Sequence, residues 1–150
     1  MPLLRAALSW NFVLATAICA SLLAQLIKVL LNLFIFHRFI AERMWGAGGM
    51  PSSHSATVCA MVVATGRYCG VNSPIFAIAA VLSIIVMYDA MGVRYETGEQ
   101  AKVLNRMFTE WMDQGFEQFQ LPHGKKLKEM VGHTPIEVVT GAALGCVLVV

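Results

Sequence analysis

The sequence has little charge and lacks the features that mark soluble or nucleic-acid-binding proteins. Only 13% of its 150 residues are charged, whereas 57% are hydrophobic, and the formal net charge at pH 7 is +2. This composition lies well outside the range of soluble domains. No stripe of basic and aromatic residues runs along the chain, so we expect no nucleic-acid partner.

Cysteine is also scarce and follows no metal-binding or redox pattern. The four cysteines, Cys19, Cys59, Cys69 and Cys146, all stand in apolar stretches. None forms a C-x-x-C pair, and their spacing is not that of structural zinc sites. We interpret them as packing residues.

Long apolar runs stand in place of these missing features. Ala6 to Ile27 is a charge-free run of 22 residues and Tyr68 to Tyr88 is one of 21. About 20 apolar residues suffice to cross the hydrocarbon core of a bilayer. The first run is longer than the core of a secretory signal, so we interpret it as a retained helix. The chain is therefore predicted to be an integral, multi-pass membrane protein.

Hydrophobic pattern and capping signals predict an all-α fold, a polytopic membrane helical bundle in a single domain, 1–150. Four membrane helices are expected over about 8–36, 51–67, 74–91 and 134–150. The soluble insertion, about 92–132, carries apolar residues from Val103 to Met112 at helical spacing. An amphipathic helix is therefore expected before the last membrane helix, either lying on the membrane or packed over the loops of the bundle.

Lysine and arginine are distributed unequally between the two sides of this bundle. One side carries eight of them, namely Arg38, Arg43, Arg94, Lys102, Arg106, Lys125, Lys126 and Lys128, and the other carries two, Arg5 and Arg67. The positive-inside rule then predicts that both long loops lie on the cytoplasmic or equivalent face.

The same face gathers most of the polar residues that could carry chemistry. They are Lys28, the turn 51–54, Asp89, Arg94 and the turn 132–137. Ionisable groups at the ends of membrane helices are costly unless they are paired or face a wet cavity. Their convergence therefore predicts a site rather than ordinary interfacial residues.

Two histidines within this group suggest phosphoryl transfer. His133 and Glu137 stand four residues apart on one helical face, so the carboxylate can orient the imidazole and leave its other nitrogen as a free lone pair. His54 stands at a helix N-terminus, which favours anions. Lys28 and Arg94 add positive charge that could hold a phosphate.

Three segments resemble the signatures of a known family. Pro51 to His54 resembles the Pro-Ser-Gly-His motif of the type-2 phosphatidic acid phosphatase superfamily, and His133 to Glu137 resembles its His-x-x-x-Asp turn. The whole chain resembles the divergent bacterial and plastid branch described as acid phosphatase/vanadium-dependent haloperoxidase-related. The segments that carry this resemblance are 48–56, 88–94 and 132–138.

The resemblance implies a core related to that of the superfamily and a role for each site residue. His133 would be the nucleophile that forms a phosphohistidine, Glu137 its orienting acid and His54 the general acid. The phosphate oxygens would be held by Lys28, Ser52, Ser53 and Arg94, with Lys128 as a weaker substitute for the missing arginine. Asp89 is kept as a possible supporting residue. This scheme needs no metal and no other cofactor.

The implied function is that of an integral membrane phosphatase acting on a lipid phosphate or another phosphate monoester, in a bacterial inner membrane or a plastid membrane. The set of basic residues that would hold the phosphate departs from the superfamily pattern, because Ile35 and Leu127 stand where arginines are expected. This departure motivates the alternative of a weak or inactive binder or transporter of phosphorylated lipids. Four helices are fewer than the six of the superfamily, which leaves a homodimer as a way to close the site.

Two further alternatives remain open at this point. His54, Asp89, His133 and Glu137 could instead form a metal site, since imidazole and carboxylate suit zinc or manganese. Asp89 could form a structural ion pair with Arg94 or Lys28, or could orient a catalytic group.

Overall fold

The structure, a computed structural model, describes residues 11–36, 49–114 and 126–150, and all helix bounds below refer to these ranges. The described elements are α2 (Phe12–Phe36), α4 (Ser53–Cys69), α5 (Pro74–Met91), α6 (Val93–Asp113) and α7 (Pro135–Val149). The all-α prediction is confirmed, and within these ranges there is no strand. The helices lie close to the expected ranges, whereas the expected first turn at residues 8–10 and the loop residues 37–48 lie outside the described part.

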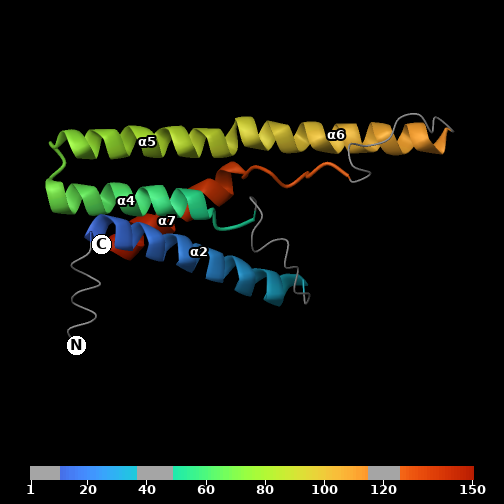
Figure 1. Cartoon of the computed structure of the whole chain (residues 1–150). Helices are drawn as coiled ribbons and strands as arrows, with labels where there is room; N and C mark the ends of the chain where they lie inside the picture. Colours follow the sequence, from blue (N-terminus) through green and yellow to red (C-terminus); the bar gives the residue numbers. More distant parts are fainter. Residues whose placement is uncertain (1–10, 37–48, 115–125) are drawn as a thin grey trace.

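The helix α4 is the centre of the bundle and contacts α2, α5 and α7 (Figure 1). Its contact surfaces are built from small residues. The core cluster comprises Ala20 and Ala24 of α2, Ala56, Ala60 and Ala64 of α4, and Val149 of α7. Small side chains at these positions let the helix backbones approach closely, as is typical of helix packing in membranes.

The backbones of α4 and α7 approach each other closely. A Cβ atom on Gly141 would lie 2.2 Å from the carbonyl oxygen of Ser52, and one on Gly145 would lie 2.2 Å from that of Ala56. Only glycine therefore fits at either position without a shift of the backbone. The two glycines, four residues apart on α7, pack the middle of this helix against the start of α4.

Large apolar side chains point outward. On α2, Leu22 is 64% exposed, and on α5, Ile78 is 68% exposed. The stretches Phe12–Phe34 and Pro74–Asp113 are long and apolar enough to cross a membrane by length and composition. An inverted arrangement, with alanine inside and large aliphatic residues outside, fits a lipid environment. The helices α4 and α7 have 17 and 15 residues, fewer than a full crossing requires, so the number of crossings stays a prediction.

The expected amphipathic helix exists as α6. Figure 1 shows α5 and α6 as one nearly straight rod, interrupted at Gly92, with α6 extending beyond the end of α4. The position of α6 relative to the membrane stays a prediction.

The segment before α7 returns along α6 toward the bundle. Asn105 donates to the carbonyl oxygen of Leu127 at 2.9 Å and accepts the Leu127 amide at 2.8 Å. Further along, a Cβ on Gly98 would lie 2.4 Å from the carbonyl oxygen of Glu129, and one on Gly132 would lie 2.2 Å from the amide nitrogen of Tyr95. These contacts place the chain directly against α6 just before it reaches His133.

Candidate functional site

The N-terminal ends of α4 and α7 meet the C-terminal end of α5 at one end of the bundle (Figure 1). Ser52 is fully buried there and links two of these helices, because its amide donates to the carbonyl oxygen of Glu137 at 3.0 Å. The amide of His133 donates to the carbonyl oxygen of Ala90 at the end of α5, also at 3.0 Å. These backbone hydrogen bonds join the helix ends that carry His54, Asp89 and His133, and so fix the positions of the three residues relative to one another.

His133 is 2% exposed, and its two ring nitrogens have different surroundings. Nδ1 lies 3.1 Å from Oε2 of Glu137, and the same oxygen accepts the amide N–H of Thr134 at 3.1 Å. The amide contact is that of a glutamate in the first turn of a helix. With a carboxylate beside it, Nδ1 carries the proton and Nε2 keeps its lone pair. Nε2 is buried and has no hydrogen-bond partner among the described residues.

Burial lowers the pKa of His133 below its ordinary value, because the charged imidazolium is poorly solvated there. The Glu137 carboxylate acts in the opposite direction and raises this pKa, whereas the positive charges of Lys28 and Arg94 lower it further. The net shift is downward. His133 is therefore neutral at pH 7, with the unshared Nε2 lone pair that a nucleophile needs.

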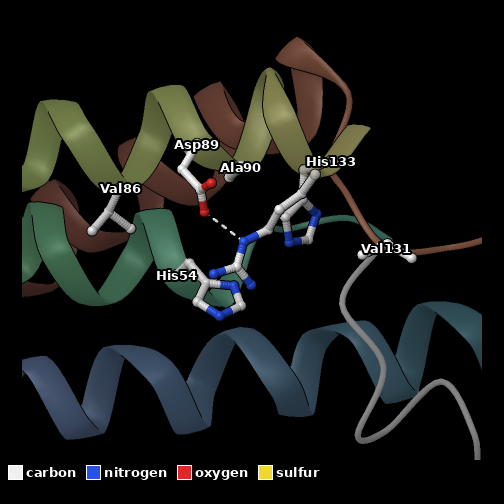
Figure 2. Close-up of a pocket in the computed structure, with 7 residues that line it drawn as sticks. His54, Val86, Asp89, Ala90, Val131 and His133 are labelled. Carbon is white, nitrogen blue, oxygen red and sulfur yellow. Dashed lines mark hydrogen bonds and ion pairs between the residues drawn. The ribbon is translucent and has the colours of Figure 1, made fainter. Parts of the chain in front are cut away.

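His54 stands in the first turn of α4 with its ring 6.0 Å from that of His133, centroid to centroid, and the two planes at 63°. A small cavity of about 20 Å³ lies between them, lined by His54, Val86, Asp89, Ala90, Arg94, Val131 and His133. Figure 2 shows His54 and His133 approaching this space from α4 and from the chain just before α7, with Asp89 above them on α5. The two histidines and the Asp89 and Arg94 side chains thus come from four separate parts of the chain.

Asp89 forms an ion pair with Arg94, drawn as the dashed line in Figure 2. One of the two pairings considered for Asp89 is therefore present in the structure. The side chains of Arg94 and Asp89 are 49% and 39% exposed, respectively. Among the described residues, Arg94 is the only lysine or arginine that lines the cavity.

Lys28 lies deeper in the bundle. It is 2% exposed and ends the buried stripe of α2 that begins with Ala17, Ala20 and Ala24. Gly49, at φ +84°, lies against its aliphatic stem, since a Cβ there would be 3.7 Å from the lysine Cδ. Among the described residues, no hydrogen bond or ion pair is found for the Lys28 ammonium. A buried cation without a partner favours an anion nearby.

The remaining predicted site residues do not line the cavity. Oγ of Ser52 accepts the amide of Ser55 at 3.3 Å, so this hydroxyl caps α4. The hydroxyl of Ser53 faces α2 and accepts from Gln25 at 3.5 Å. Lys128 is exposed on the segment beside α6. The structure therefore gives the two serines structural contacts, and a phosphate contact for any of the three stays a prediction.

Sequence reasoning missed the apolar part of the site. Val86, Ala90 and Val131 line the cavity, yet no local pattern sets them apart from other apolar residues. Ala90 stands within the segment 88–94 that carried the resemblance, and this was the one available signal. For the metal alternative, the described residues contain no group of three or more histidine, cysteine, aspartate or glutamate side chains that could hold a metal ion.

Comparisons with known proteins agree with this architecture. The family model described as the divergent PAP2 family matches residues 9–148. The uncharacterized membrane protein YuiD of Bacillus subtilis strain 168 is 38% identical over 144 residues, which cover 92% of this chain and 91% of that protein. No solved structure gives a significant match. The chain therefore belongs to the divergent PAP2 family, and it is a membrane protein of all-helical fold.

Proposed function

We propose that the protein is a membrane phosphatase that hydrolyses a phosphate monoester, carried on a lipid, through a phosphohistidine intermediate. One observation carries this proposal. The Nε2 atom of His133 is buried and has no hydrogen-bond partner in the described part of the chain, and His133 faces His54 across the cavity. The large majority of buried side-chain nitrogens in proteins have a hydrogen-bond partner, and an exception calls for an explanation such as a catalytic role.

In the first step, the lone pair of His133 Nε2 attacks phosphorus and the bond to the ester oxygen breaks. The leaving alkoxide takes a proton from His54, acting as general acid. In the second step, a water molecule attacks the phosphohistidine while His54 accepts the water's proton. Inorganic phosphate leaves, and His133 regains its lone pair.

The charged residues support this chemistry, because phosphoryl transfer depends chiefly on positioning and on compensating negative charge. Glu137 holds the tautomer of His133 and stabilises the positive charge that develops on the ring. Arg94 lines the cavity, and Lys28 places a buried positive charge close enough to lower the pKa of His133. We therefore propose Lys28 and Arg94 as the main cations that would attract the phosphate.

The test uses the purified full chain in nanodiscs with dioctanoyl phosphatidic acid as substrate. Phosphate release is expected from the wild type and from Gln100→Ala, an exposed control on α6. His133→Ala and His54→Ala are expected to lose it. Equal inactivity of the wild type and both histidine variants across a panel of lipid phosphates would reject the phosphatase.

The second candidate is a binder or transporter of phosphorylated lipids. One observation favours it: within the described ranges, the only lysine or arginine that lines the cavity is already paired with Asp89, which leaves little positive charge free for catalysis. Binding of dioctanoyl phosphatidic acid that survives His133→Ala, with no turnover by the wild type, would select this function over the enzyme.

We further propose that the site opens on the cytoplasmic or equivalent face of a bacterial inner or plastid membrane. The cavity lies at the end of the bundle from which α6 and its basic residues extend, whereas Arg67 lies at the other end, where it donates to the last carbonyl groups of α7. In a cysteine-free background, Lys128→Cys should be protected from a membrane-impermeant maleimide in intact cells, and Asn72→Cys should be labelled. The reverse pattern would overturn this orientation.

A further inference from the structure

The cavity between the two histidines is too small for the substrate that the site is proposed to bind. Its volume of about 20 Å³ is room for roughly one water molecule. A phosphoryl group has a phosphorus and at least three oxygen atoms, so it can enter only if a lining side chain moves.

Part of the lining is held in place. His133 is buried and bonded through both Nδ1 and its amide, and Ala90 is a buried residue of α5. Arg94 differs, because its side chain is long, 49% exposed and held in this position by a single ion pair with Asp89. This long side chain can leave its position at little cost, because an exposed ion pair contributes little stability.

The ion pair also occupies the guanidinium group of Arg94, to which a phosphate would bind. Nε of Arg94 donates to Oδ2 of Asp89. A phosphate monoester dianion binds an arginine through the same donors, in the same planar geometry as a carboxylate. Asp89 and a bound phosphate would therefore compete for Arg94, and the carboxylate, which itself lines the cavity, would repel the dianion.

From this arrangement we infer that Asp89 sets the phosphate affinity of the site by competing with the substrate's phosphate for Arg94. The inference rests on the proposed function, since it assumes that the cavity takes a phosphate monoester. In the free protein Arg94 pairs with Asp89, and in the complex it turns to the phosphate oxygens. Asp89 thereby acts as a positioning residue that weakens the binding of substrate and of product phosphate alike, which favours release after turnover.

The test measures binding of inorganic phosphate to the full chain by calorimetry, which requires no turnover. Asp89→Asn is expected to tighten phosphate binding by about two- to fivefold. This factor corresponds to the free energy of an exposed ion pair, which no longer competes with the phosphate. Asp89→Ser serves as a second variant, and a merely structural role for Asp89 would not produce tighter binding. Glu110→Gln is the matched control, because it removes a carboxylate from an exposed arginine pair elsewhere on α6 and should leave phosphate affinity unchanged.

A double-mutant cycle isolates the role of Arg94. In an Arg94→Gln background, Asp89→Asn should give a clearly smaller gain, since no guanidinium is released. Dioctanoyl phosphatidic acid, titrated into the His133→Ala chain, forms the second arm. Tightening for both ligands supports recognition of the phosphate itself, and tightening for the lipid alone supports recognition of the lipid-borne phosphate.

The outcomes separate this inference from the proposed function. If the wild type binds phosphate and the Asp89 variants bind it equally or more weakly, competition is wrong while the phosphate site stands. If neither the wild type nor Asp89→Asn binds inorganic phosphate or dioctanoyl phosphatidic acid, the proposed function and the inference both fail.

Discussion

Glu137 stands one helical turn after His133, and its Oε2 atom lies 3.1 Å both from Nδ1 of that histidine and from the amide nitrogen of Thr134. The same carboxylate oxygen therefore orients the proposed nucleophile and satisfies an amide at the start of α7. Because both contacts fall within five consecutive residues, the orientation of His133 depends on the geometry of a single helix start.

The first prediction concerns this carboxylate. Glu137→Gln keeps the shape of the side chain but removes the charge that favours a protonated Nδ1 and stabilises the developing imidazolium. We expect kcat for lipid phosphate hydrolysis to fall by about 10²- to 10⁴-fold, the usual size of an acid-base contribution. Wild-type kcat in Glu137→Gln, with the fold intact by circular dichroism, would show that the contact has no catalytic role.

The pH profile provides a second prediction. Only neutral His133 can attack phosphorus, so kcat/KM is lost as pH falls through its pKa. Because burial lowers that pKa, the acidic limb should lie below the ordinary value of 6.5. Glu137 raises the pKa, so Glu137→Gln should move the limb to still lower pH. An acidic limb above 6.5 in the wild type would contradict the assignment.

Lys28 is the subject of the third prediction. Lys28→Met removes the buried charge but keeps a side chain of similar length, and replacing a buried charge by an apolar group costs little stability. We expect kcat/KM to fall roughly 10- to 100-fold, as for the loss of a contact to a charged group, with little change in Tm. Lys102→Met on exposed α6 is the matched control. A loss of activity that accompanies a comparable loss of Tm would point to a structural role instead.

The fourth prediction tests the contact between α7 and α4. Gly145→Ala forces a Cβ to within 2.2 Å of the Ala56 carbonyl oxygen, where only backbone can give way. We expect a loss of about 1–3 kcal/mol in the free energy of unfolding, the range for overpacked cores. In the control Gly66→Ala, the nearest atom is a Phe76 side-chain carbon at 3.1 Å, which can shift. Equal unfolding free energies for the two variants, measured by denaturant titration in detergent, would contradict the close approach.

Local chemistry explains why parts of the site could be predicted from the sequence. The pairing of His133 with Glu137 follows from four-residue spacing at a helix start, and Ser52 is recognisable as a capping residue before α4. The ranges of the membrane helices follow from apolar run length. The amphipathic pattern of α6 was also visible, but its direction was not, because direction depends on how the chain passes Gly92 and on the segment that Asn105 holds against the helix.

The sequence by itself determined that this is an all-helical membrane protein of the divergent PAP2 family, since composition, run length and short motifs are properties of neighbouring residues. Only the tertiary structure decided which of its polar residues share a cavity. Asp89 and Arg94 line it with the two histidines, whereas Ser52 and Ser53 turn to other partners. That division depends on helix rotation and on backbone contacts between distant segments, such as His133 with Ala90, which no local pattern encodes.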